Sequence, residues 1–246
     1  RAAESDAERR LDHDRRLFEI YRDMTETQAS FHTGLRVFAA RPDDGDMRKQ
    51  LFVQAEELSR FEELAAVYEK ALVDEAGLLD AFLKRMLSGE VAGIYEHKVG
   101  RPTEAEVAWR RVLEVDEGNE NAFDALERLL RTKEQWEDLV ELLLRRERAT
   151  MDPGQRARVL LALCDLYEGP LAKPTGALDA YRTVLEIDPT LSRAYRALAR
   201  LHTANEEWAE LEDNLARETL HVSEQADVVS LTYQRALLFA ERLENP

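Results

Sequence analysis

The chain has 246 residues, of which 44% are hydrophobic, and its 34 basic and 50 acidic side chains give a formal net charge of −16. Only 10 residues are glycine and 7 are proline, a composition that disfavours turn-rich β folds and predicts an all-α protein. The negative charge opposes nucleic-acid binding, and no apolar stretch approaches the roughly 20 residues of a membrane helix, so we expect neither nucleic-acid binding nor membrane insertion.

Amphipathic helices are predicted along the whole chain, because apolar residues recur at spacings of three and four. Pro102 and Pro174 stand where a helix begins, and Asp188-Pro189 where one ends, since a helix tolerates proline in its first turn but not in its interior. No strand is expected. The expected helices span about residues 5–24, 27–40, 46–58, 61–75, 84–98, 103–116, 119–131, 134–149, 154–168, 173–187, 190–203, 206–221 and 224 onward.

The sequence repeats itself at a constant offset, the one that aligns Trp136 with Trp208. We call it the repeat offset. Of the 51 residues from Tyr95 to Arg145, 21 are identical to the residue one repeat offset further on. A more diverged copy lies upstream, where Phe61 takes the position of Trp136. The repeating unit therefore contains four helices and recurs about three times, and its aromatic positions are expected to pack between helices.

The repeat resembles the tetratricopeptide repeat (TPR). The resemblance rests on Ala177-x-x-Ala180-Tyr181-x-x-Val184-Leu185-Glu186-Ile187-Asp188-Pro189, followed by Ala194-Tyr195-x-x-Leu198-Ala199 and then Trp208. It implies a right-handed α-solenoid of about six stacked antiparallel helical hairpins, a TPR-like superhelix. We expect residues 1–45 to form a diverged N-terminal hairpin, continuous with a TPR-like array over residues 46–246.

Catalytic and metal-binding patterns are not found in the sequence. The five histidines have no metal-ligand spacing, and there is no glycine-rich phosphate loop and no nucleophile motif. His202 is expected to be a packed structural residue, and Cys164, the single cysteine, a small buried thiol. We therefore expect no enzymatic activity, no cofactor and no metal site.

Polar residues on the first helix of each hairpin are the candidate binding site, because the resemblance implies that these helices line a concave face. Arg193, Arg196 and Arg200 share one helix face and offer donors to carboxylates, which predicts an acidic partner peptide or domain. The alternative is an ordinary surface whose arginines are neutralised by Asp124 or Asp165. The candidate positions are Asn121, Asp124, Arg128, Arg131, Arg158, Asp165, Glu168, Arg193, Arg196 and Arg200.

Three functions are compatible with these features. The first is a non-catalytic scaffold that binds a partner peptide or domain along the concave face. The second is a regulatory or substrate-recruiting arm of a larger enzyme. The third is a self-assembly module that forms homo-oligomers by stacking terminal hairpins.

The source and the cellular location are inferred from the amino-acid composition and from the two ends of the sequence. Only six of the 34 basic residues are lysine, and this excess of arginine indicates a GC-rich bacterial genome. The chain begins without methionine and ends after a helical pattern, so we interpret it as a piece of a longer protein. We expect a cytoplasmic location, with the periplasm as the alternative.

Overall fold

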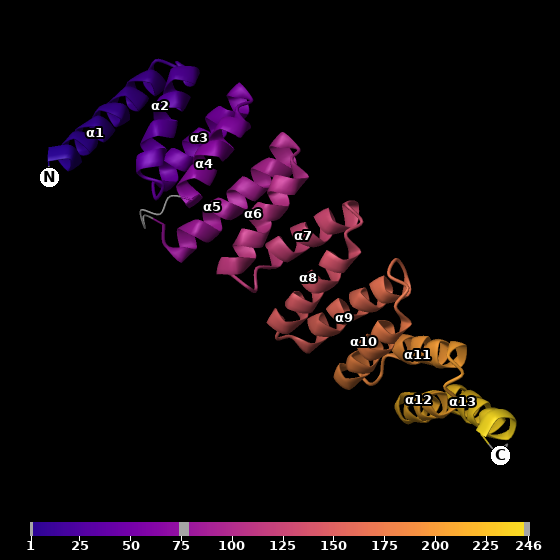
Figure 1. Ribbon diagram of the computed structural model, residues 1–246. Helices are drawn as coiled ribbons and strands as arrows, with labels where there is room; N and C mark the ends of the chain where they lie inside the picture. Colours follow the sequence, from indigo (N-terminus) through magenta and orange to yellow (C-terminus); the bar gives the residue numbers. More distant parts are fainter. Residues whose placement is uncertain (1, 74–78, 244–246) are drawn as a thin grey trace. The chain divides into compact units, whose positions relative to one another are not determined.

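The computed structural model describes residues 2–73 and 79–243, and these form thirteen α-helices and no strand (Figure 1). A short π-helical turn follows the fifth helix and another follows the last, at Tyr95–Val99 and Phe239–Leu243. The helices are α1 (Ala2–Asp23), α2 (Thr27–Ala40), α3 (Gly45–Leu58), α4 (Phe61–Val73), α5 (Ala81–Ile94), α6 (Pro102–Val115), α7 (Glu120–Thr132), α8 (Trp136–Ala149), α9 (Pro153–Glu168), α10 (Pro174–Ile187), α11 (Ser192–Ala204), α12 (Trp208–His221) and α13 (Gln225–Leu238).

The all-α prediction is confirmed, and the expected helix bounds agree closely with the structure. The last two residues of the expected 61–75 helix lie outside the described residues. The start of α5 differs most among the later helices, because Asp80 caps it by accepting a hydrogen bond from the backbone N–H of Leu83 at 2.7 Å. Asp44 and Asp152 cap α3 and α9 in the same way.

The helix bounds follow the sequence repeat. Helices α9 to α12 begin one repeat offset after α5 to α8, and α13 begins one repeat offset after α9. Near the N-terminus, α2, α3 and α4 begin at a slightly longer constant offset before α6, α7 and α8, although their sequences have diverged. The four-helix period is therefore a structural repeat as well as a sequence repeat, and it makes α1, α5, α9 and α13 equivalent helices.

The residues fall into two compact units, an N-terminal unit of residues 1–129 and a C-terminal unit of residues 130–246. Helices that are consecutive in the sequence pack side by side from α1 to α6 and from α8 to α13. The division between the two units falls inside α7. The predicted boundary between residues 45 and 46 separates the diverged N-terminal hairpin from the rest of the array, and it stays a prediction.

The N-terminal unit has a continuous apolar core from α1 to α6. Phe31, Phe38 and Tyr68 are fully buried in it, and the Phe38 and Tyr68 rings lie 4.8 Å apart. Helix α2 packs closely at Gly34, where an added Cβ would lie 2.9 Å from the side chains of Phe18 and Leu51. Glycine is therefore required by packing at this position.

The C-terminal unit buries the same repeat positions. Ala177, Val184 and Leu185 of α10 are buried, as their counterparts are in α6. At the C-terminal end, Leu211 and Leu215 of α12 form a smaller cluster with Leu231 and Leu238 of α13. This last helix therefore buries fewer side chains than α11 and α12 do.

The tryptophans of the repeat are less buried than full packing between helices would require. Trp136 and Trp208 are the first residues of α8 and α12, and each is only partly buried. The guanidinium of Arg242 lies 4.8 Å from the centre of the Trp208 ring. A residue in the first turn has no preceding turn of its own helix over it, so these side chains stay partly in contact with water.

Equivalent leucines in the two units should have similar effects on stability. Leu126 and Leu198 are 0% and 3% exposed, so Leu126→Ala or Leu198→Ala should lower the free energy of unfolding by about 2–5 kcal/mol in denaturant titrations. Val107 is 57% exposed, so the control Val107→Ala should change it by less than about 0.5 kcal/mol. A loss below about 1 kcal/mol at both leucines would contradict the repeat register.

Candidate functional site

The C-terminal unit contains a hollow of about 780 Å³ between α9, α10 and α11. Predicted site residues line it, namely an aspartate and a glutamate of α9 and the three arginines of α11. We call it the arginine hollow. Its lining residues are Asp165, Glu168, Gly169, Tyr181, Arg193, Arg196, Ala197 and Arg200.

The sequence of α11 places its arginines in this hollow. Arg193, Arg196 and Arg200 are three and four residues apart and therefore share one side of the helix. The other side buries Tyr195 and Leu198 in the core. Packing of the apolar side thus leaves all three arginines on the side of α11 that lines the hollow.

Two of the three arginines are held by carboxylates of α9. Arg193 Nη2 lies 2.6 Å from Asp165 Oδ1, and Arg200 pairs with Glu168. The Arg193 pair is open to solvent, since its side chains are 54% and 59% exposed, whereas the Glu168 side chain is only 18% exposed. The alternative of helix-to-helix ion pairs thus applies to Arg193 at Asp165, and Glu168 adds a second pair.

Glu168 also accepts a hydrogen bond from the hydroxyl group of Tyr181, at 2.7 Å from its Oε1. Burial raises the pKa of Tyr181, and this hydrogen bond raises it further. One carboxylate therefore joins side chains from α10 and α11, and it holds Arg200 in place.

The same arrangement recurs in the N-terminal unit. Trp109 Nε1 donates a hydrogen bond to Glu96 Oε2 at 3.1 Å, and Arg128 Nε donates one to Glu96 Oε1 at 3.0 Å. Glu96, Trp109 and Arg128 lie one repeat offset before Glu168, Tyr181 and Arg200. We call each set a Glu-aromatic-Arg triad. Its recurrence indicates that Arg128 and Arg200 join helices together.

Arg196 differs from its two neighbours. Among the described residues the structure records no ion pair for it, and its Nε donates to the carbonyl of Ser192 in its own helix, at 3.3 Å. It also borders a second hollow, of about 430 Å³, which is lined by residues of α11, α12 and α13. Burial raises the pKa of Glu218 in that second hollow, and the charge of Arg196 opposes the increase.

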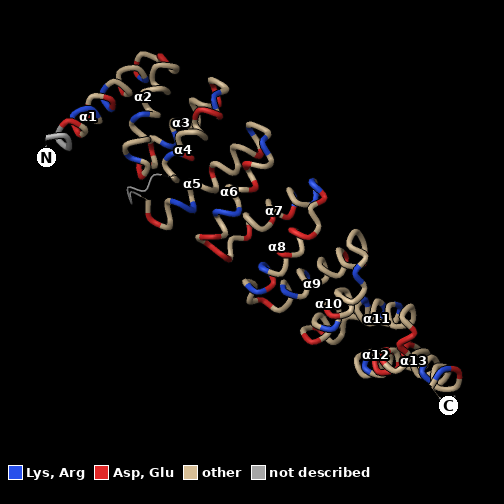
Figure 2. The backbone as a smooth tube through the Cα atoms, in the orientation of Figure 1, with Lys and Arg blue, Asp and Glu red and all other residues tan. Residues whose placement is uncertain are grey.

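The remaining predicted residues lie outside the arginine hollow. Asn121, Asp124 and Arg131 are exposed on α7, and Arg158 is exposed on α9. Arg128 is held in the triad of the N-terminal unit. Figure 2 shows that acidic and basic residues are interspersed along the helices.

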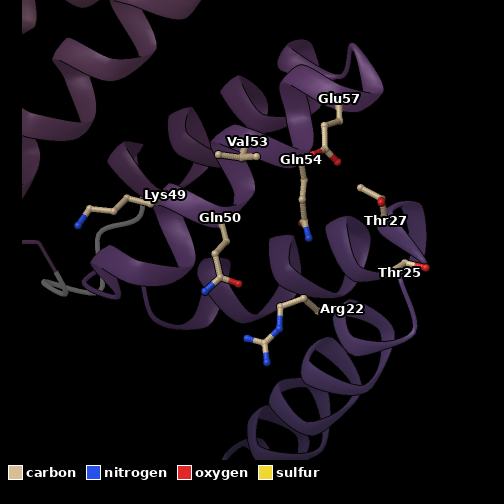
Figure 3. A pocket seen from close by; sticks show the side chains of 8 residues that line it. All are labelled: Arg22, Thr25, Thr27, Lys49, Gln50, Val53, Gln54 and Glu57. Atoms are coloured by element: carbon tan, nitrogen blue, oxygen red, sulfur yellow. The ribbon is translucent and has the colours of Figure 1, made fainter.

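A separate hollow of about 400 Å³ lies in the N-terminal unit between α1, α2 and α3 (Figure 3). Arg22, Lys49, Gln50 and Gln54 contribute polar groups to it, while Val53 is 56% exposed on its wall. Gln54 Nε2 donates a hydrogen bond to the Ser30 hydroxyl group at 2.9 Å. The sequence analysis missed this hollow, because uncharged amides in a helix form no pattern that stands out.

Sequence reasoning also missed the triads, although a signal for them exists. Glu96 and Glu168 are identical residues at equivalent repeat positions, and so are Arg128 and Arg200. Two opposite charges that are retained together on helices of neighbouring hairpins indicate a contact. Comparison of the polar positions of the repeat, in addition to the apolar ones, would have found the triads.

Cys164 and His202 are both buried in the structure. Burial raises the pKa of the Cys164 thiol to about 12, so it stays protonated at neutral pH and is a poor nucleophile. His202 is buried and its Nδ1 lies 2.6 Å from Glu207 Oε2, which fits a packed structural residue. In the part of the chain that the structure describes, no group of three potential metal ligands occurs, and no helix is long and apolar enough to cross a membrane.

Neither a protein-family model nor a curated protein sequence matches the chain. Among solved structures, that of Naa15/Naa10 bound to HypK-THB has a TM-score of 0.52 and 14% identity, covering 96% of this chain and 34% of the other. YrrB, described as a TPR protein with an unusual peptide-binding site, has a TM-score of 0.38 and 18% identity, with 72% and 84% coverage. The TPR2AB domain of yeast Sti1, in a pHSP90 complex, has a TM-score of 0.34 and 13% identity, with 94% and 97% coverage.

Removal of the triad carboxylate should destabilise both units. Glu168→Ala and Glu96→Ala each remove two hydrogen-bond acceptors and leave an arginine unpaired, so each should lower the free energy of unfolding by about 1–3 kcal/mol. Glu186 is exposed on α10, and Glu186→Ala is the matched control. Equal stability of the control and both triad variants in urea titrations would show that the triads do not join the helices.

The charge on Glu218 should cost stability at neutral pH. Its pKa is raised in the folded protein, so the folded state loses stability as the pH rises through that value, whereas a glutamine cannot ionise. Glu218→Gln should match the original protein in melting temperature near pH 4 and exceed it near pH 7. A difference that is the same at both pH values would contradict this assignment.

Proposed function

We propose that this chain, which has a TPR-like helical-repeat fold, is a non-catalytic scaffold that binds an acidic segment of a partner protein in the arginine hollow. The observation that carries the proposal is Arg196, a guanidinium in an open hollow for which no ion pair is recorded among the described residues. A guanidinium group presents several donors in a fixed plane and suits carboxylates in particular.

Arg193 supplies a second contact to the partner segment, because its ion pair with Asp165 is exposed to solvent. Exposed ion pairs contribute about 0–1 kcal/mol, because water screens them and the side chains lose freedom. A carboxylate of the partner can therefore replace Asp165 as the acceptor for Arg193 at small cost. Arg200 does not exchange in this way, since Glu168 is shielded and is also bonded to Tyr181.

The solved structure of Naa15/Naa10, which has a TM-score of 0.52 to this chain, is consistent with a protein partner. The Naa15/Naa10 structure contains a bound protein segment, HypK-THB, and this chain covers about a third of the length of the matched chain. For the present chain, support comes from the arginine hollow itself, because its lining offers charged donors on an open surface. A flexible acidic segment can follow such an open surface.

The arginine hollow should bind acidic peptides in a salt-dependent way. A short fluorescein-labelled peptide rich in Glu and Asp should bind in anisotropy titrations, and Arg193→Gln or Arg196→Gln should each weaken binding by about tenfold. Raising the salt from about 0.05 to 0.5 M should weaken it as well. The control Arg182→Gln, on α10 outside the hollow, should bind like the original protein.

Neutral substitutions are preferred to charge reversal in this experiment. A glutamate in place of Arg193 would face Asp165, and one in place of Arg196 would approach the buried Glu218, so both would disturb the fold as well as the site. If both glutamine variants bind the acidic peptide with unchanged affinity, or if a lysine-rich peptide binds more tightly, the proposal is wrong.

A further inference from the structure

The hollow beside Glu218 contains an ionisable side chain that protein atoms almost enclose. Glu218 of α12 lines this hollow of about 430 Å³ between α11, α12 and α13, and the residue is only 7% exposed. Among residues 2–73 and 79–243, the structure gives its carboxylate neither an ion pair nor a hydrogen bond. Buried carboxylates normally have a counter-charge or several hydrogen-bond donors, so Glu218 lacks the partner that its burial calls for.

The charged residues that line this hollow do not balance one another. Arg196 of α11 contributes one positive charge, whereas Glu218 and Asp227 contribute two negative charges. The described residues include no ion pair between Arg196 and either carboxylate, and Arg196 Nε donates instead to the carbonyl of Ser192 at 3.3 Å. Burial raises the pKa of Glu218, the charge of Arg196 opposes the increase, and that of Asp227 adds to it. The hollow is therefore short of one positive charge.

The repeat does not require a carboxylate at this position. The equivalents of Arg196 and Glu218, one repeat offset earlier, are Asp124 and Arg146, so the sign of the charge is reversed at both positions. The carboxylates of the Glu-aromatic-Arg triads, in contrast, are the same residue in both copies. A purely structural role in the repeat would have retained the residue in the same way, so the unpaired Glu218 is particular to this copy.

The rest of the lining indicates which kind of cation fits. Ser230 and Gln234 of α13 add a hydroxyl and an amide group, and Leu215, Val222 and Leu231 add apolar surface. An alkylammonium group matches both, because it has three N–H donors at the end of an apolar chain. A metal ion fits less well, since the described residues contain no group of three side chains of the types that ligate metals.

We propose that the hollow beside Glu218 binds an alkylammonium group, either a lysine side chain or one end of a free polyamine. Glu218 accepts hydrogen bonds from the ammonium group, and the exposed Asp227 adds negative charge at the edge of the site. The alkyl chain packs on Leu215 and Leu231. This proposal does not rest on the binding of an acidic segment in the arginine hollow, because it concerns a ligand of the opposite charge.

Small amines test the proposal on the whole chain. The probe is n-butylammonium chloride near pH 8, where the amine is still charged and carboxylates are ionised. Tetramethylammonium chloride at the same concentration is the reference, because it has the same charge and no N–H donor. At about ten times its Kd, n-butylammonium should raise the melting temperature by about 3–6 °C relative to the reference.

The variant Glu218→Gln should not respond to n-butylammonium. We expect this variant to be more stable than the original protein near neutral pH, so a lost response cannot be attributed to unfolding. Glu186→Gln is the matched control, since it removes the same charge from an exposed position of α10, and it should respond like the original protein.

Arg196→Gln separates this proposal from the proposed function. Removal of the one positive charge in the lining should strengthen amine binding by at least about twofold. The same variant is expected to weaken the binding of the acidic peptide to the arginine hollow. Because the two effects have opposite signs, either proposal can fail without the other.

Two further probes identify the source of the alkylammonium group. Nα-acetyl-lysine amide presents a lysine side chain as a protein does, whereas putrescine represents the free polyamines. Tighter binding of the lysine derivative would identify a lysine of a partner protein, and tighter binding of putrescine would identify a free polyamine. Both results support an alkylammonium site.

Other outcomes would overturn the assignment. One is an equal effect of n-butylammonium and tetramethylammonium on the melting temperature. Another is a response of Glu218→Gln to n-butylammonium that equals that of the original protein, and a third is weaker amine binding by Arg196→Gln. Stronger stabilisation by calcium chloride than by n-butylammonium at equal ionic strength, lost in Glu218→Gln, would show that the hollow holds a metal ion instead.

Discussion

The structure depends on the fact that each of its helices has two sides to cover. Helix α5 shows this most clearly: Leu87 and Val91 are fully buried, and so are Ser88 and Ala92, which point in a different direction around the helix. A single hairpin cannot bury both sides, because its two helices cover only one side of each other. Neighbouring hairpins must supply the rest, and stability therefore comes from contacts between successive helices.

This dependence explains why polar residues recur in the repeat together with apolar ones. The Glu-aromatic-Arg triads join a helix to the next hairpin through hydrogen bonds. Their carboxylates are shielded, so the triad arginines hold a fixed position and are poor donors to a ligand. For Arg196 no ion pair is recorded among the described residues, whereas Arg200 pairs with the shielded Glu168 of α9. The arginine hollow thus contains guanidinium groups that hold helices together as well as one that can donate hydrogen bonds to a ligand.

The sequence predicted the helices and the repeat because both depend on local patterns. Three local features were enough to place the helices that the structure describes. They are the spacing of apolar residues, the prolines Pro102 and Pro174 at helix starts, and the repeat offset. The pairing of Arg200 with Glu168 was not predicted, because it depends on which turns of two helices face each other. The partial exposure of Trp136 and Trp208 was missed for a similar reason, since an aromatic residue in a repeat pattern does not reveal that it stands in the first turn of its helix.

Helix α13 forms one wall of the hollow beside Glu218. Its residues Asp227, Ser230 and Gln234 line this wall, and Arg196 borders the same hollow. Few side chains of α13 are buried, and helices with few buried contacts unfold locally at low cost. Local opening of α13 therefore removes one wall of the hollow next to Arg196. Because the coupling between binding and local order is reciprocal, a ligand that binds only the ordered hollow must stabilise α13 against opening.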